Sequence, residues 1–240
     1  MTSNHATLAI PEIVPKESWE LEFNLRHAIP SSTRHQPAKG LLLFSEILNF
    51  DSSMKVLDAG SGNGRNTVYL AKRGCEVTAV DFSDFALDET KRRVTEARLA
   101  HKVSIVRHSL VDPVPFPNEY FDCVVDSYVF CHFLRDEIGQ RFWREMARVT
   151  KRGRHMLSIV FSTEDEYYSR LRKDTQDGSL ICDPANGIWK RLYTEDEIKR
   201  FFSTLEVELK YFAKLEFSDV VMGKTYRRVV FTSVLRKFVG

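Results

Sequence analysis

The stretch KVLDAGSGNGRNTVYLAKRGCEVTAVDFS, residues 55–83, carries the signals that decide the fold of this chain. An apolar run too short for a helix leads into the glycine-rich turn 60–64. Helical spacing holds from residue 65 to residue 73, and a second apolar run then ends at Asp81. This order of strand, glycine turn, helix and strand predicts a parallel β-α-β unit. A ligand can approach the backbone of such a turn because no Cβ holds it off.

The acidic residue at the end of the second strand predicts a nucleoside ligand. Asp81 follows Gly60 by about 20 residues, the spacing of a carboxylate that hydrogen-bonds a ribose diol. A dinucleotide fingerprint requires glycine at the sixth position of the turn, where this chain has Arg65. Asp58, just before the turn, would repel a pyrophosphate and suits a ligand that carries positive charge. NAD-linked redox chemistry is therefore disfavoured.

The segments GSGNGRNTVYLAKRG, residues 60–74, and VTAVDFS, residues 77–83, resemble those of the class I S-adenosylmethionine-dependent methyltransferases. The cofactor of that superfamily carries a sulfonium and an ammonium and no phosphate. Within the superfamily, the two segments are most similar to the branch that contains tellurite-resistance and thiopurine methyltransferases. The resemblance covers roughly residues 19–162. It implies S-adenosyl-L-methionine as cofactor and S-adenosyl-L-homocysteine as product.

The resemblance also implies a Rossmann-like α/β fold. The expected sheet has seven mostly parallel strands in the order 3-2-1-4-5-7-6, an antiparallel last strand and helices on both faces. Patterns along the chain predict strands after the first at 77–80, 103–107, 121–129, 155–161, 205–217 and 226–235, and helices near 19–26, 41–50, 65–73, 84–100, 136–150 and 194–202. The segment KRGR, residues 151–154, is predicted to be a turn.

Composition indicates a soluble, cytoplasmic protein. The 240 residues have a formal net charge of +2, which gives no electrostatic footprint for nucleic acid or an acidic membrane. The four cysteines lack CxxC spacing and are expected to be reduced thiols, and no run of 18 apolar residues or signal peptide is visible. We expect a flexible tail at 1–15 and one domain at 16–240, as a monomer or homodimer without a metal.

The predicted cofactor site combines the glycine turn with the ends of several strands. In the family, an acidic residue near position 109 usually accepts a hydrogen bond from the adenine amino group. Here the matching residue is Ser109, so its hydroxyl, the Leu110 backbone or Asp112 would replace that contact. The segment SWELEF resembles an N-terminal piece of the family that folds over the cofactor. The alternative is that its tryptophan only packs a terminal helix onto the sheet. The predicted cofactor-binding residues are Trp19, Asp58, Gly60, Ser61, Gly62, Asn63, Asp81, Phe82, Ser109, Leu110 and Asp126.

The predicted chemistry is an in-line displacement, which requires alignment and desolvation more than covalent help. A base is needed only when the attacking atom still carries a proton. His132 is the preferred base, because imidazole titrates near neutrality and the residue follows the fourth strand. Tyr128 would orient the acceptor or shield the sulfonium. Asp126 and, more weakly, His108 are further candidates. Each of the first two acidic or basic candidates also has a non-catalytic alternative. His132 would then be a histidine hydrogen-bonded at a strand end, and Asp126 would be a carboxylate that caps the next turn.

The segment 162–193 mixes aromatic and basic residues and is too long for a simple connection. We interpret it as an acceptor lid, beside an N-terminal cap at 16–50. The alternative is an amphipathic helix that packs its aromatic side chains on the sheet. The expected function is methyl transfer to a thiol, chalcogen, hydroxyl or amine group of a small molecule. A non-catalytic module that binds S-adenosylmethionine is the competing hypothesis, and aminopropyl transfer is disfavoured because no acidic polyamine-binding cluster surrounds Asp126.

Overall fold

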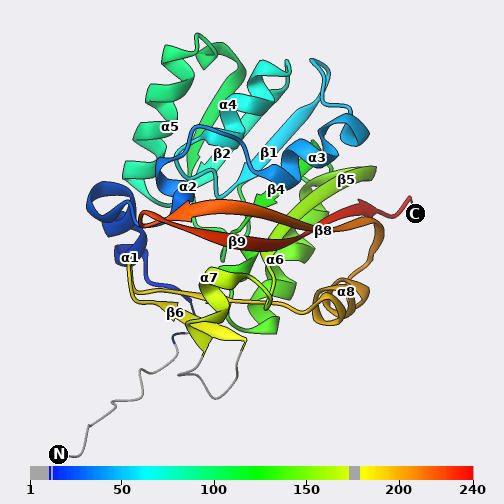
Figure 1. Cartoon of the computed structure of the whole chain (residues 1–240). Coiled ribbons are helices and arrows are strands. Elements are labelled where there is room, and N and C mark those ends of the chain that lie inside the picture. The colour runs from blue at the N-terminus through cyan, green and yellow to red at the C-terminus, as the bar shows by residue number, and fades with distance from the viewer. Residues whose placement is uncertain (1–10, 12, 173–178, 240) are drawn as a thin grey trace, which may run out of the picture.

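A seven-stranded sheet runs through the computed structural model, which describes residues 11, 13–172 and 179–239 (Figure 1). Its strands are β1 (Lys55–Ala59), β2 (Glu76–Asp81), β3 (Val103–Arg107), β4 (Phe121–Ser127), β5 (Thr150–Phe161), β8 (Val207–Val221) and β9 (Lys224–Lys237). The order is β3-β2-β1-β4-β5-β9-β8. Strands β1 to β5 pair in parallel, whereas β9 is antiparallel to both β5 and β8. The predicted fold and strand order are confirmed, with β8 and β9 as the sixth and seventh strands of the main sheet.

The helices cover both faces of the sheet. They are α1 (Lys16–Leu21), α2 (Pro30–Thr33), α3 (Lys39–Leu48), α4 (Arg65–Lys72), α5 (Asp84–Glu96), α6 (Asp136–Val149), α7 (Glu166–Ser169) and α8 (Glu195–Ser203). The buried side chains of α3 and α4 pack on one face of the sheet, and those of α6 and α8 pack on the other. Within the described residues, no helix combines the length and apolar character needed to cross a bilayer.

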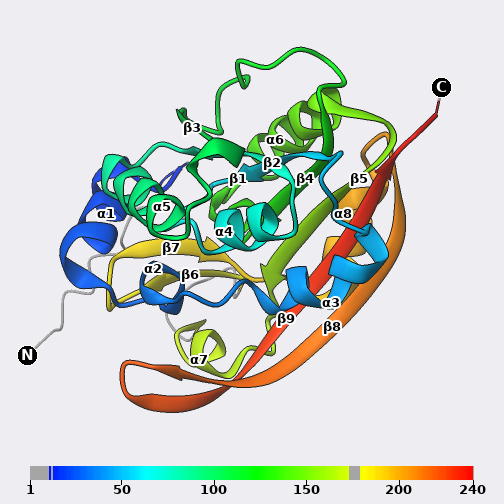
Figure 2. The ribbon, with the colours of Figure 1, turned by 90° about the horizontal axis from the view of Figure 1, so that it is seen from above.

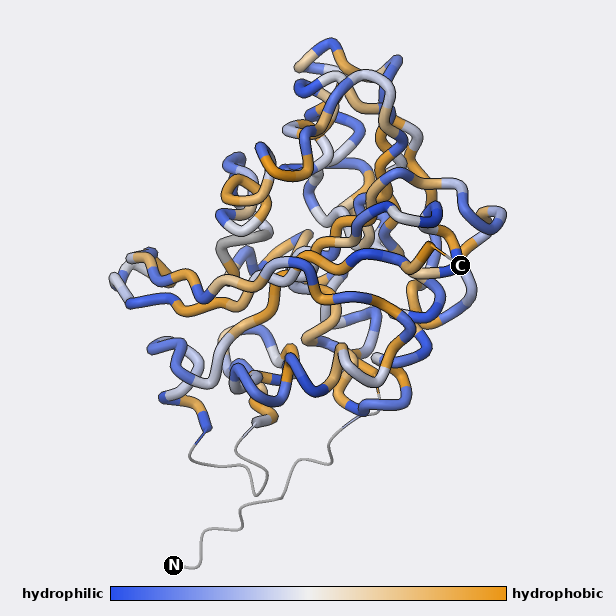
Figure 3. The backbone as a smooth tube through the Cα atoms, turned by 90° about the vertical axis from the view of Figure 1, so that its right-hand side faces the viewer, coloured by the Kyte–Doolittle hydropathy of each residue, from blue (hydrophilic) through white to orange (hydrophobic). Residues whose placement is uncertain are grey.

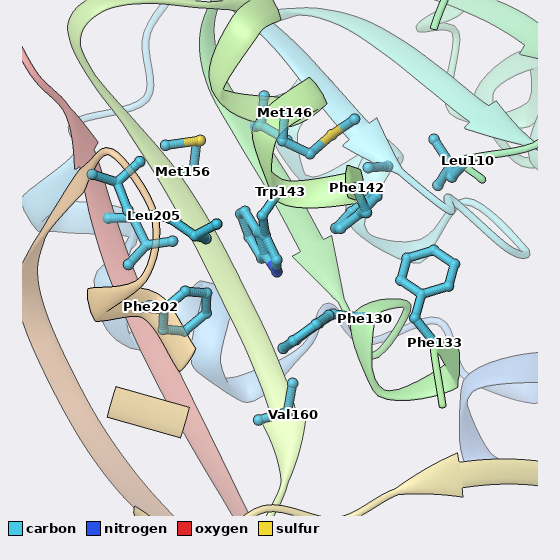
Figure 4. Close-up of a cluster of buried hydrophobic side chains, with 14 of the residues drawn as sticks. Leu110, Phe130, Phe133, Phe142, Trp143, Met146, Met156, Val160, Phe202 and Leu205 are labelled. Carbon is cyan, nitrogen blue, oxygen red and sulfur yellow. The ribbon is translucent and has the colours of Figure 1, made fainter. Parts of the chain in front are cut away.

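The larger core lies between the sheet and the α6–α8 layer. Trp143 of α6 points toward Phe130 of the 3-10 turn η3 (Phe130–His132) and toward Phe202 of α8, whereas Phe142 lies beside Phe133 (Figure 4). Phe130 stacks on Tyr193 with ring centroids 5.4 Å apart. The core is therefore continuous from η3 to Tyr193, at the edge where the ligand site is expected.

The β8–β9 hairpin is longer than predicted and extends past the rest of the sheet (Figure 2). β9 pairs with β5 only as far as Val230, and from there the two long strands pair only with each other up to the turn at Met222 and Gly223. Half-buried and exposed residues alternate over 213–220 of β8, as expected for a ribbon with one solvated face, and hydrophobic and hydrophilic residues are mixed along the hairpin (Figure 3). The hairpin therefore brings residues of the C-terminal third over the carboxyl ends of the parallel strands.

Two local predictions are wrong. The KRGR segment 151–154 is not a turn but the first part of β5, where Gly153 has φ of +72° and the β4–β5 register shifts nearby. The glycine lets the strand begin irregularly and still continue the sheet. The predicted flexible tail at 1–15 is also too long. Ile13 forms a β-bridge with Phe133 and Val14 is buried, while residues 1–10 and 12 lie outside the described residues.

The segment 162–193 forms a small unit of its own beside the main sheet. It contains α7 and an antiparallel pair, β6 (Leu180–Asp183) and β7 (Ile188–Arg191), and residues 173–178 of it lie outside the described residues. The buried Glu22 ties this unit to the N-terminal segment, because its carboxylate accepts hydrogen bonds from the Ile29 N–H, the Ser32 hydroxyl and the Asn186 amide. The predicted cap and the predicted lid therefore contact each other directly.

Candidate active site

A cavity of about 670 Å³ opens at the carboxyl ends of the parallel strands. It lies where ligands bind in open α/β sheets, between the N-terminal segment, the glycine turn and the overhanging β8–β9 hairpin. Most of the predicted site residues meet on its wall: Trp19, Gly60, Ser61, Gly62, Asn63, Asp81, Phe82, Ser109, Leu110, Tyr128 and His132. Asp58 and Asp126 are absent from the wall.

The glycine turn is shaped by positive backbone angles and close packing. Gly60 has φ of +71°, and a Cβ at that position would lie 2.2 Å from Cγ2 of Val129. Its N–H and that of Ser61 both donate to the carbonyl of Val80 on the neighbouring strand. The turn is therefore held against the ends of β1 and β2 with its backbone exposed to the cavity.

Asp81 joins the second strand to the glycine turn. Its carboxylate accepts hydrogen bonds from the Gly62 N–H at 2.9 Å and from the Ser83 N–H at 3.0 Å. Burial raises the pKa of this carboxyl, and the backbone hydrogen bonds oppose that shift. Each oxygen accepts one backbone hydrogen bond and keeps acceptor capacity toward the cavity. This arrangement suits a ligand with two neighbouring hydroxyl groups.

Asp58 does not reach the cavity, so its predicted contact with a cationic ligand is wrong. The side chain is fully buried beneath the turn, and its Oδ2 accepts a 2.6 Å hydrogen bond from the Thr67 hydroxyl of α4. Burial raises the pKa of this carboxyl to about 6. Asp58 therefore ties β1 to the helix that follows the turn and acts on the ligand only through the position of the backbone.

Asp126 is likewise a structural residue, and both of its predicted roles, as a base and as a cofactor ligand, are contradicted. Its Oδ1 accepts from the N–H groups of Val129 and Phe130, and its Oδ2 accepts from the Ser158 hydroxyl at 2.9 Å. The side chain is fully buried, and burial raises its pKa to about 7. The carboxylate caps the turn that leads into η3, which is the structural role expected as the alternative to catalysis.

His132 lies on the cavity wall with a fixed tautomer. Its Nδ1 lies 2.8 Å from the carbonyl oxygen of Trp189 in β7, and because a carbonyl only accepts, Nδ1 carries the proton. The Trp19 ring meets the imidazole edge to face, with centroids 4.6 Å apart. Burial and the nearby positive charge of Lys190 together lower the pKa of His132 to about 3. Such a low proton affinity argues against the predicted role as general base.

The low pKa of His132 predicts a measurable effect of pH on stability. The folded pKa is about 3 and the unfolded value is 6.5, so the stabilisation is complete above 6.5 and is lost as pH falls below it. Between about pH 7.5 and about pH 5.5, the wild-type protein should lose about 1.4 kcal/mol more unfolding free energy than His132→Gln. Urea unfolding of both proteins at the two pH values measures the difference. Parallel losses would show that the imidazole is protonated in the fold.

The N-terminal segment forms one wall of the cavity. Glu20 of α1 accepts hydrogen bonds from the Ser83 hydroxyl at 2.8 Å and from the Asp84 N–H at 3.1 Å, which fixes α1 at the start of α5. Trp19 stacks on Phe23, and a Cβ on Gly62 would lie 3.3 Å from the Phe23 ring. The aromatic side chains of this segment therefore lie directly over the glycine turn.

The opposite wall contains basic residues that sequence reasoning did not assign to the site. Arg228 of β9 is 3% exposed, and its Nε donates a 2.8 Å hydrogen bond to the buried Asp165. Lys190 of β7 is buried with its Nζ 3.1 Å from the Tyr168 hydroxyl. Arg65, the first residue of α4, lies over the ring of Tyr128. A signal was present for Arg228, because alternation along β9 places it on the same face as the buried Val230 and Val234.

The third strand supplies the remaining part of the wall. Ser109 and Leu110 follow β3 and line the cavity. His108 does not line it, since its Nε2 lies 3.0 Å from the carbonyl oxygen of Pro113. The candidate role of His108 in catalysis is therefore contradicted.

The cavity fits S-adenosylmethionine in three respects. Asp81 presents a carboxylate at the strand end, the turn has no Cβ at Gly60 or Gly62, and the cavity volume lies within the range of small-molecule sites. The Ser61 hydroxyl is a further polar group on the wall, buried and without a hydrogen-bond partner among the described residues.

Part of the chain is similar in sequence to known methyltransferases. Residues 56–153 match the family model described as a methyltransferase domain. The chain is 30% identical over 132 residues to an uncharacterized methyltransferase of Bacillus licheniformis, an alignment that covers 54% of this chain and 58% of that protein. It is 34% identical over 118 residues to demethylmenaquinone methyltransferase of Corynebacterium efficiens, covering 49% and 46%. The chain thus spans about half the length of these curated relatives.

Solved structures resemble the fold over most of the chain. A S-adenosylmethionine-dependent methyltransferase from Methanosarcina mazei has a TM-score of 0.71 at 19% identity, covering 81% of this chain and 98% of that one. The 1,6-didemethyltoxoflavin-N1-methyltransferase of Burkholderia thailandensis, solved with S-adenosylhomocysteine, has a TM-score of 0.60 at 19% identity, covering 83% and 77%. Residues 56–153 therefore resemble a methyltransferase domain, and the chain has the fold of solved S-adenosylmethionine-dependent methyltransferases.

Proposed function

We propose that the protein is an enzyme that transfers a methyl group from S-adenosylmethionine to a small organic acceptor by in-line displacement. One observation carries this proposal. A single cavity joins the wall of the glycine turn and Asp81 to a second wall formed by Tyr128, Phe161 and Arg228. The volume of about 670 Å³ leaves space for a second small molecule beside a nucleoside. Relatives named for demethylmenaquinone and magnesium protoporphyrin support an organic acceptor.

The residues of the first wall would hold the cofactor. S-adenosylmethionine, when bound, supplies an electrophilic methyl group on a sulfonium. Asp81 would accept hydrogen bonds from the ribose hydroxyls, and Phe82, Ser109 and Leu110 would enclose the adenine. Trp19 and its neighbours on the N-terminal segment exclude water from the same wall, which strengthens the electrostatic interactions inside.

The second wall would orient the acceptor. Tyr128 has φ of +68°, and its ring stacks on Phe161 with centroids 4.5 Å apart. Asp126 uses both oxygens within the fold, and His132 has a low proton affinity. These two facts favour an acceptor that loses its proton before attack, such as a thiol, over an aliphatic alcohol. They are the reason to propose a place near the tellurite-resistance and thiopurine branch as the finer assignment.

The segment 162–193 is proposed to act as the lid over the acceptor, together with the cap at 16–50. Tyr168 and Lys190 of this segment line the cavity, and Glu22 of the cap is hydrogen-bonded to its Asn186. Both segments belong to one domain in this proposal. Contacts of this kind couple acceptor binding to the position of the cap.

Release of S-adenosylhomocysteine from S-adenosylmethionine tests the proposed activity. Purified protein is incubated with the cofactor and a panel of thiols, selenols, amines and phenols, and the product is quantified by mass spectrometry. We expect acceptor-dependent release, fastest with a thiol. Tight binding of the cofactor without release for any acceptor would favour the alternative, a non-catalytic module that senses S-adenosylmethionine.

A further inference from the structure

The charges on the cavity wall are unbalanced. Among the described residues that line it, six side chains are cationic and two, Asp81 and Asp219, are carboxylates. Asp219 pairs with Arg34, and Asp81 faces the glycine turn. The buried Lys190 is near Asp183, with Nζ 3.7 Å from Oδ2. Arg228 is paired with the buried Asp165 and Lys16 with Glu20, and Lys39 is exposed. Among the described cations of the wall that are not exposed, Arg65 therefore lacks a carboxylate partner, while Arg228 keeps an unused hydrogen-bond donor.

Arg228 presents a hydrogen-bond donor that the fold does not use. Asp165 binds its Nε, and its guanidinium lies over the rings of Phe161 and Tyr168 at 5.1 Å and 5.0 Å from their centroids. Its Nη2 is buried and has no hydrogen-bond partner among the described residues. A buried donor without a partner costs about 1–3 kcal/mol, and the ion pair with Asp165 does not relieve this cost at Nη2. A ligand oxygen in the cavity would satisfy this donor.

Arg65 adds a second guanidinium to the same wall. It lies over the Tyr128 ring, 5.9 Å from the centroid, and no carboxylate in the described part of the chain forms an ion pair with it. Burial lowers the pKa of Arg65, and the positive charge of Arg34 lowers it further. A partly buried cation in this situation is stabilised by an anion that enters the cavity.

We infer that the methyl acceptor is an organic acid whose carboxylate binds between the guanidinium groups of Arg65 and Arg228. The inference rests on the proposed function and names its substrate class. Two guanidinium groups offer several N–H donors in planar arrays, which match the two oxygens of a carboxylate. The carboxylate is the group by which the acceptor is held, and the attacking atom lies elsewhere on the molecule.

The rest of this wall selects an acid with an apolar body. Aromatic rings of Tyr128, Phe161 and Phe217 line the cavity around the arginines, and Leu42 of α3 adds an aliphatic side chain. A flat aromatic or unsaturated acid can bury its ring against these side chains while its carboxylate meets the guanidinium groups. A small inorganic oxyanion would leave this apolar surface uncovered.

Calorimetric titration of the protein saturated with S-adenosylhomocysteine tests the inference. The probes are benzoate, cinnamate and indole-3-acetate, each paired with its neutral carboxamide. At least one acid should bind, and its amide should bind at least about tenfold more weakly, as expected for loss of charge-assisted hydrogen bonds. Binding of S-adenosylhomocysteine is measured first. Its absence would count against the proposed function, whereas its presence with no bound acid, or with acid and amide bound equally, overturns the inference.

Three variants identify the guanidinium groups. Arg65→Met should weaken the bound acid about tenfold, Arg65→Lys should weaken it less, and Arg144→Met on the exposed face of α6 should leave it unchanged. Arg65 is used because Arg228→Met also breaks a buried ion pair. Unchanged acid affinity in Arg65→Met would overturn the inference. So would a loss of affinity for S-adenosylhomocysteine but not for 5′-methylthioadenosine, because Arg65 would then hold the carboxylate of the cofactor.

Discussion

Replacing Asp165 by alanine is expected to lower the free energy of unfolding by about 3–5 kcal/mol, the usual cost of breaking a buried ion pair from one side. Asp165 is fully buried, and its Oδ2 accepts hydrogen bonds from Arg228 Nε at 2.8 Å and from the Val229 N–H at 3.0 Å. Its Oδ1 accepts from the Tyr168 N–H at the start of α7. The variant leaves the buried Arg228 charge uncompensated and removes a helix cap at the same time.

The neighbouring Glu164 provides a matched control for Asp165. It forms an ion pair with Lys214 at 2.6 Å, but the two side chains are 52% and 32% exposed. Solvent screens such a pair, so Glu164→Ala should cost less than about 1 kcal/mol. Urea unfolding of both variants, followed by circular dichroism, makes the comparison. If Asp165→Ala were no less stable than Glu164→Ala, Arg228 would have to be stabilised by the aromatic rings alone.

A double variant separates the lost ion pair from the lost cap. In Asp165→Ala with Arg228→Met, no charge remains buried at this position, whereas the cap of α7 is still absent. We expect the double variant to recover about 1–4 kcal/mol of the loss, because an apolar pair of similar volume is tolerated where a lone charge is not. A double variant that is less stable than Asp165→Ala would show that Arg228 stabilises the fold without Asp165.

The fold could be predicted because its deciding signals are local. The glycine turn, the spacing to Asp81 and the apolar strands identify the β-α-β unit, and right-handed crossovers then limit the order of the strands. The length of the β8–β9 hairpin could not be predicted. In the outer half of the hairpin the two strands pair only with each other. The sequence there has no hydrophobic pattern imposed by packing on the main core that would mark where the strands end. The start of β5 also could not be predicted, because the glycine in KRGR is typical of a turn. In the structure this glycine lies within an irregular part of the strand.

The sequence predicts where the candidate site lies, but it does not predict which way the side chains at that place point. Asp58 and Asp126 stand at strand ends as expected, yet each turns into the fold and binds a hydroxyl, of Thr67 or Ser158. Position along a strand identifies the edge where a ligand binds, whereas hydrogen bonding after folding decides which carboxylates reach it. Arg228 was missed because it reaches the cavity only through the overhang of the hairpin.

Asp81→Ala is expected to weaken binding of S-adenosylhomocysteine by about 1–3 kcal/mol, which is roughly five- to 150-fold in dissociation constant. The carboxylate would accept hydrogen bonds from the ribose, and it already accepts from the Gly62 and Ser83 N–H groups. The substitution therefore removes the ligand contact and also an anchor of the glycine turn. Asp84→Ala is the matched control, because Asp84 is exposed at the start of α5, carries the same charge and lies off the cavity wall.

The two consequences of Asp81→Ala can be separated with a second ligand. Calorimetry compares 5′-methylthioadenosine with its 2′,3′-dideoxy analogue, which lacks the diol and keeps the adenine. Wild-type protein should prefer the diol by about tenfold, as expected for hydrogen bonds to a charged group, and Asp81→Ala should bind both compounds with similar affinity. A loosened glycine turn would weaken both compounds equally and would leave the preference intact. If the preference for the diol survives in Asp81→Ala, the ribose is held by another group, and the role assigned to Asp81 is wrong.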